Sequence, residues 1–155
     1  MTIIDANNLA GNLGLLDKKN FDHLLIDIIK EYNQDRKQKI FLVFDSTDPM
    51  GDKFREDDII VIYAPRDNYY RNADDKIIEL AREAEDNHII IITDDIEIKE
   101  KIKKLKLDLK LDLNLVTATD FVDNLKTSLE EEPDEKDLGD AQKEKINQEL
   151  LNIWR

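Results

Sequence analysis

Aspartates stand where several apolar segments of this chain end and where amphipathic segments begin. They occur at three expected strand ends and at one expected helix start: Asp5, Asp45, the pair Asp94 and Asp95, and the pair Asp74 and Asp75. Ligands of an open α/β sheet bind in the crevice beyond the carboxyl ends of its strands. We therefore expect these carboxylates to meet at one edge of a sheet.

Carboxylates brought together repel one another, which raises their pKa values unless a cation compensates them. An all-oxygen set of ligands suits a hard divalent cation, so the sequence favours Mg²⁺ or Mn²⁺. Sites of this kind hold one or two ions and catalyse phosphoryl chemistry by activating water and neutralising the leaving oxygen. The alternative is that Asp74 and Asp95 simply cap the helices that follow them.

Alternating apolar runs and amphipathic stretches predict the elements that must position these acids. The expected strands cover residues 2–5, 40–44, 59–63, 89–92 and 113–117, and the expected helices cover residues 21–32, 73–84, 96–105 and 121–125. Unbroken Ile, Val and Leu runs are typical of parallel strands that are buried on both faces. We therefore predict an α/β fold, a three-layer sandwich with a mainly parallel central sheet.

Three segments between these elements are harder to interpret. Asn7 and Asn8 are expected in a loop that contains glycine, and residues 48–55 are expected in a second loop. Residues 106–115 alternate leucine with polar residues. This pattern predicts either one long strand at the sheet edge or a helix end followed by a strand.

Composition restricts the classes of function. The 155 residues suit about one domain and include no cysteine and two histidines, which excludes disulfide frameworks, thiol nucleophiles and Cys-ligated metal sites. The formal net charge of −13 opposes casual binding to nucleic acid or anionic lipid. The chain has no apolar run of about 18 residues and no signal-like start, so we expect a cytoplasmic protein.

The composition changes near the C-terminus. Residues 129–140 are acidic, contain Pro133 and Gly139, and are expected to form a linker. Residues 141–155 then carry an amphipathic pattern with Ile146, Leu150 and Trp154. The resulting helix is expected either to dock on the domain of residues 1–128 or to bind a protein partner or the ribosome.

Four short segments resemble motifs of the NYN family in the PIN-like ribonuclease superfamily. They are residues 4–8, 43–45, 72–77 and 92–95, each at an expected element boundary. The nearest branch is the YacP-type NYN domain, and the resemblance covers roughly residues 1–128. Asn7 stands where the family often has an aromatic residue, and Asp94 stands where it has a small hydroxyl residue.

The resemblance implies a metal-dependent endoribonuclease that hydrolyses single-stranded RNA by two-metal catalysis. One ion would activate water, the other would stabilise the departing 3′ oxygen, and the product would carry a 5′-phosphate. Asp5, Asp74 and Asp95 would be the catalytic metal ligands. Asp45 and Asp94 would be further acids at the metal, with either Asp94 or Asp95 facing it. The supporting residues would be Asn8, Asp75 and Thr93.

Aromatic and basic residues that suit single-stranded RNA occur in the loop before the central helix: Arg66, Tyr69, Tyr70 and Arg71. Stacking on aromatic rings and cationic contacts to phosphate are how proteins hold single strands. Lys53 and Arg55 are further candidates for phosphate contacts. Lysines 99, 101, 103 and 104 form the largest basic concentration of the chain, although such a run is more often a solvated helix face.

Two other functions compete with the ribonuclease prediction. The first is a catalytically weak PIN-like module that binds RNA or protein through its C-terminal helix. The second is another Asp-rich phosphoryl-transfer fold, such as a phosphatase or a phospho-acceptor receiver. A receiver needs an acceptor aspartate on a central strand and a lysine at another strand end, and residues 45–48 do not supply a persuasive version.

Overall fold

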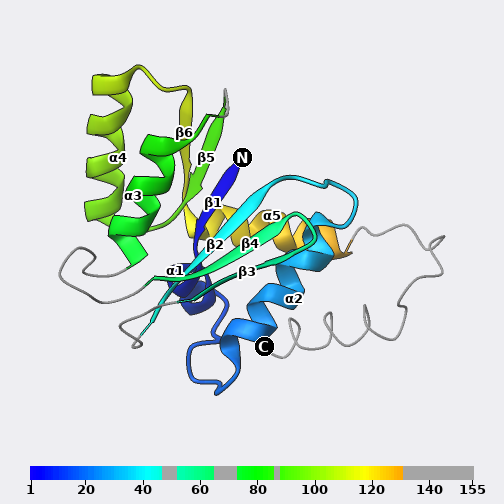
Figure 1. The fold of residues 1–155 in the computed structure, drawn as a ribbon. Coiled ribbons are helices and arrows are strands. Elements are labelled where there is room, and N and C mark those ends of the chain that lie inside the picture. The colour runs from blue at the N-terminus through cyan, green and yellow to red at the C-terminus, as the bar shows by residue number, and fades with distance from the viewer. Residues whose placement is uncertain (47–51, 65–72, 86–87, 131–155) are drawn as a thin grey trace.

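The computed structural model describes residues 1–46, 52–64, 73–85 and 88–130 (Figure 1). In chain order the elements are β1 (Thr2–Asp5), α1 (Ala6–Asn12), α2 (Phe21–Asn33), β2 (Ile40–Asp45), β3 (Asp52–Glu56), β4 (Ile59–Ala64), α3 (Ala73–Glu83), β5 (Ile89–Ile92), α4 (Ile96–Leu109), β6 (Leu113–Val116) and α5 (Ala118–Glu130). No helix in these ranges has the length and apolar character needed to cross a membrane.

The strands form one mainly parallel sheet in the order β3-β4-β2-β1-β5-β6. β1 lies in the middle and pairs in parallel with β2 and β5. Its last residue, Asp5, is in register with Val43, close to the end of β2. The carboxyl ends of these three central strands therefore lie at the same edge, where an open α/β sheet binds its ligands.

Helices cover both faces of the sheet and confirm the predicted three-layer sandwich. α1, α2 and α5 pack on one face through residues such as Leu9, Leu25 and Phe121. α3 and α4 pack on the other face, with Ile77 and Ile102 buried against the strands (Figure 1). Successive strand residues point to opposite faces, so the central strands are apolar throughout because both faces are buried.

The loop predicted for residues 48–55 is wrong from Asp52 onward, because Asp52–Glu56 is strand β3. It pairs antiparallel with β4 and has no partner on its other side in the described sheet. Its side chains alternate, so Phe54 packs toward the core while Lys53 and Arg55 remain exposed. Charged residues are common on edge strands, where they discourage further pairing. Because four of the five residues of β3 are charged, the strand has no apolar run that would predict it.

The loop predicted for Asn7 and Asn8 is also wrong, because helix α1 begins at Ala6 directly after β1. Asparagine is a weak helix former, and seven residues are too few for a stable isolated helix. Tertiary packing compensates, since Ala6, Leu9 and Ala10 are completely buried against the core.

The alternating leucines are divided between a helix and a strand. α4 runs to Leu109, Lys110 then adopts a left-handed conformation with a φ of 52°, and β6 begins at Leu113 at the sheet edge. Leu107 is 79% exposed and Leu113 only 1%. The predicted alternative of a helix end followed by a strand is therefore confirmed.

Residues 131–155, with most of the expected linker and the whole expected C-terminal helix, lie outside the described residues.

The layer of α3 and α4 depends on buried isoleucines of β5, which supplies a test of the fold. Ile91 is completely buried beneath these helices, whereas Leu107 is mostly exposed. We expect Ile91→Ala to lower the free energy of unfolding by about 2–5 kcal/mol, because it removes apolar contacts and leaves a cavity. Leu107→Ala should change it by less than about 0.5 kcal/mol. Urea unfolding of both variants measures this, and equal losses would contradict the described packing.

Candidate metal centre

A cleft of about 510 Å³ opens at the carboxyl ends of β1 and β2. Its lining residues are Asp5, Asn7, Asn8, Gly11, Asn12, Leu16, Asp45, Asp74 and Asp95. Four aspartates named from the sequence thus lie around one cleft although they come from four separate places in the chain. Of the residues that line it in the described part of the chain, none is cationic.

Asp5 is the most buried acid of the cleft. Its side chain is 5% exposed, and it sits at the junction of β1 and α1. Burial raises the pKa of Asp5 to about 7, a hydrogen bond from Thr93 opposes this rise, and the charges of Asp74 and Asp45 add to it. The carboxylate therefore lacks the positive charge that would make its ionised form stable at neutral pH.

Thr93 connects Asp5 to the start of α4. Its hydroxyl donates to Asp5 Oδ2 at 3.0 Å and accepts from the backbone N–H of Asp95 at 3.0 Å. The side chain is completely buried. With its proton and lone pair both engaged, Thr93 fixes the position of Asp5 relative to the turn between β5 and α4.

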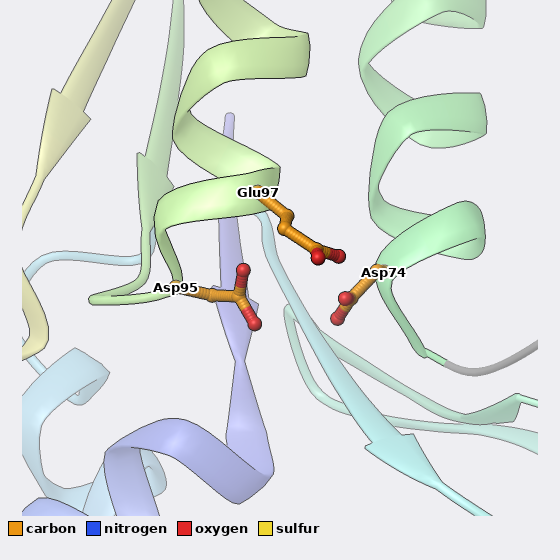
Figure 2. Close-up of side chains that lie close together, drawn as sticks. All are labelled: Asp74, Asp95 and Glu97. Carbon is orange, nitrogen blue, oxygen red and sulfur yellow. The ribbon is translucent and has the colours of Figure 1, made fainter.

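Asp74, Asp95 and Glu97 form the tightest group of carboxylates. One carboxylate oxygen from each lies within 4.8 Å of the others. Figure 2 shows Asp74 extending from the first turn of α3 toward Asp95 and Glu97 at the start of α4. Asp95 also caps α4, since its Oδ1 accepts the N–H of Ile98 at 3.1 Å. Asp95 therefore both caps α4 and lines the cleft.

Glu97 was not singled out from the sequence. Acidic residues are common in the first turn of any helix because they favour the positive end of its dipole. The signal that would have found it is its position, two residues after Asp95 and within the first turn of the helix that Asp95 caps. Its approach to Asp74 depends on the neighbouring helix α3, which the local sequence does not reveal.

The negative groups around Asp74 affect its protonation. Burial, together with the charges of Asp95, Asp45 and Asp75, raises the pKa of Asp74 to about 6, and the charge of Lys101 opposes the rise. Asp75 acts on Asp74 in this way without lining the cleft itself.

Asp94 takes a different position from its neighbour Asp95. Its Oδ1 accepts the backbone N–H of Ala118 at 2.8 Å, at the start of α5. Its Oδ2 accepts from Asn12 Nδ2 and from Thr119 Oγ1, both at 3.2 Å. Asp94 is not among the residues that line the cleft, whereas Asp95 is.

Two asparagines of α1 connect β1 to the strands on either side. Asn7 Oδ1 accepts the backbone N–H of Asp45 at 3.0 Å, and Asn8 Oδ1 accepts that of Asp94 at 2.9 Å. Both residues line the cleft, and within the described ranges neither Nδ2 group donates a hydrogen bond. Each Nδ2 group can therefore donate to a ligand in the cleft, and each Oδ1 retains a second lone pair.

Of the other residues named from the sequence, one lies away from the cleft, four lie outside the described residues, and Asp45 lines the cleft. Lys53 is exposed on β3 and does not line the cleft. Arg66, Tyr69, Tyr70 and Arg71 lie outside the described residues. Asp45 is exposed at the end of β2, and its Oδ1 accepts the N–H of Ala73 at 2.7 Å, so it holds the first residue of α3.

The residues of the cleft fit a hard divalent cation. The charged groups are all carboxylates, the neutral polar groups are asparagine amides, and the lining includes no histidine, so oxygen ligands prevail. Mg²⁺ and Mn²⁺ prefer such ligands. The raised pKa of the buried Asp5 reflects an uncompensated carboxylate, which is the condition that a cation would relieve.

Comparison with known proteins gives one match. A family model described as the YacP-like NYN domain matches residues 2–155. The match includes every described helix and strand and continues through the region expected to hold the linker and C-terminal helix. No curated protein and no solved structure matches the chain.

The raised pKa of Asp5 predicts how the metal-free protein responds to pH. Since its pKa rises from 3.8 to about 7 on folding, Asp5 contributes stability below about pH 4 that is lost as the pH rises through 7. In EDTA, Asp5→Asn should therefore be more stable than the wild type at pH 8, by up to about 4 kcal/mol, and this difference should shrink toward pH 4.

Urea unfolding between pH 4 and pH 8 measures the difference. The matched control is Asp17→Asn, the same substitution at an exposed aspartate of the α1–α2 connection. A gain for Asp5→Asn that did not depend on pH would contradict the burial of an ionisable carboxylate at this position.

Proposed function

The chain belongs to the family of YacP-like NYN domains, and from this premise we propose that it is a metal-dependent endoribonuclease of the PIN-like type. Its substrate is single-stranded RNA, and its reaction is hydrolysis of a phosphodiester bond. One observation carries the proposal: Asp5, Asp45, Asp74 and Asp95 converge on one cleft whose most buried member has no cationic partner there.

We assign the metal to the carboxylates of Asp5, Asp74 and Asp95, with Glu97 beside them and Asp45 at the margin. Mg²⁺ or Mn²⁺ bound there supplies an activated water and neutralises negative charge on the leaving oxygen. Asp94 holds the start of α5 in this proposal and Asp95 faces the metal, because only Asp95 lines the cleft.

The chain's own residues position the reacting groups. Thr93 holds Asp5 in one orientation, and the backbone of the β5–α4 turn holds Thr93. The Nδ2 groups of Asn7 and Asn8 present donors to the cleft, where they would contact oxygens of the scissile phosphate or of the ribose. Without a bound cation, about half of the Asp5 carboxyl groups would carry a proton at pH 7, because the pKa lies near 7.

A strongly acidic protein repels RNA, so the proposal requires local attraction to phosphate. The metal would provide it at the cleft, since the described lining holds no cationic residue. Arg66, Tyr69, Tyr70, Arg71 and Lys53 remain predicted RNA contacts. The division into residues 1–128, 129–140 and 141–155, and the binding of a protein partner or the ribosome through the last segment, also stay predictions.

Metal binding should be visible without any substrate. We expect Mn²⁺ at about 100 times its Kd to raise the melting temperature of the wild type by about 5–10 °C, because it binds only the folded cleft. Asp5→Asn should abolish most of this rise and Asp17→Asn should retain it. Differential scanning calorimetry of the three proteins measures the effect. An unchanged rise in Asp5→Asn would place the ion elsewhere.

Catalysis is tested with labelled single-stranded RNA and Mn²⁺. We expect Asp74→Asn to lower the cleavage rate by at least about 100-fold, because loss of a direct ligand should cost at least as much as loss of its supporting groups. Asp75→Asn is the matched control, since it removes the adjacent carboxylate that does not line the cleft and should leave most of the activity.

EDTA should stop the wild-type reaction, and the products should carry 5′-phosphates. If Mn²⁺ binds the wild type but the RNA stays intact, the nuclease proposal is wrong. The alternative of a PIN-like binding module would then apply.

A further inference from the structure

A second hollow lies outside the acidic cleft, in a groove between α3 and α4. It encloses about 280 Å³ and is lined by Ile78, Arg82, Lys101, Lys104, Leu105 and Asp108. Ile78 and Leu105 belong to the packed layer beneath these helices and make the groove partly apolar. Three of the lining side chains are positive and one is negative, the opposite of the balance in the cleft.

The groove and the candidate metal centre are formed by the same two helices, α3 and α4. Figures 1 and 2 show α3 and α4 side by side, with Asp74 at the start of one helix and Asp95 at the start of the other. Arg82 follows Asp74 by eight residues of α3, or about 12 Å along the helix axis. Lys101 lies near enough to Asp74 for its charge to lower the pKa of that carboxyl group.

The cations of the groove outnumber its one acidic lining residue, Asp108. Within the described residues, none of Arg82, Lys101 and Lys104 forms an ion pair. In a chain with a net charge of −13, three unpaired cations in one groove form a local region that attracts anions. Lys103 lies beside Lys104 in the sequence but does not line the groove, so the basic run is divided between the groove and the solvent-facing side of α4.

We propose that the groove between α3 and α4 binds the sugar–phosphate backbone of the RNA strand as it continues from the acidic cleft. Arg82, Lys101 and Lys104 contact successive phosphates, while Ile78 and Leu105 pack against the sugars. Contacts of this kind position a strand without reading its sequence. This inference rests on the proposed ribonuclease function and adds the path that the substrate takes across the surface.

The test compares Lys104→Gln, Arg82→Gln and their double variant with Lys103→Gln as the matched control. All three side chains are exposed, so folding should be retained. Cleavage of single-stranded RNA with Mn²⁺ is measured over a range of salt concentrations. We expect each groove substitution to raise KM by about tenfold, as for a lost hydrogen bond to a charged group. Each should also reduce the slope of log KM against log salt by about one.

The rise in KM of the groove variants should be larger for a long oligonucleotide than for a dinucleotide, because a dinucleotide does not extend beyond the cleft. Lys103→Gln should keep the wild-type KM and salt slope. If the wild type cuts RNA and the double variant has the same KM and slope, the groove proposal is overturned while the proposed function stands. An equal rise in KM in Lys103→Gln and Lys104→Gln also overturns the groove proposal. A wild type that neither binds nor cuts RNA overturns both.

Discussion

The repulsion between carboxylates in one cleft is the constraint on which the rest of this structure depends. Asp5 experiences it while almost completely buried: burial contributes most to its raised pKa, and the charges of Asp74 and Asp45 add to the rise. An arrangement of this kind destabilises the ionised protein unless a cation or a proton compensates it. The fold nevertheless maintains it, because the starts of α3 and α4 and the ends of two central strands all bring acids to the same cleft. A cluster of carboxylates with raised pKa values, kept although it destabilises the ionised protein, is typical of a functional site.

The scaffold that maintains the cleft consists of hydrogen bonds between adjacent strand ends. β1 lies between β2 and β5, and Asn7 and Asn8 bind the ends of these two neighbours. Thr93 connects Asp5 with the start of α4, and Asp94 connects the same turn with α5. Asp5, Asp45 and Asp95 each accept a hydrogen bond from a hydroxyl or a backbone N–H, which holds these three carboxylates in place. Preorganisation of this kind positions the ligands of a metal before the metal arrives.

Charge is distributed unevenly along α3 and α4. Their first turns carry the acidic group at the cleft, while their later turns carry the cations of the groove. This order agrees with the helix dipole, which favours acids near the N-terminus and bases near the C-terminus. In the proposed function, the same two helices would hold a cation at one end and contact a polyanion along the other. The net negative charge would then not prevent action on RNA, because attraction to phosphate is needed only along the path of the strand.

The amino-acid sequence alone determined the fold class and the positions of most acids of the cleft. Unbroken apolar runs identify buried parallel strands. Asp5 and Asp45 come directly after two such runs, so their place at the strand ends was predictable. Strand β3 and helix α1 were not predictable in this way, because an edge strand needs few apolar residues and a seven-residue helix owes its stability to packing. Only the tertiary structure distinguished Asp95 from Asp94 and brought Glu97 close to Asp74 and Asp95 in the candidate metal centre. Which way adjacent carboxylates point depends on partners far away in the chain, such as the start of α5, and no local pattern contains them.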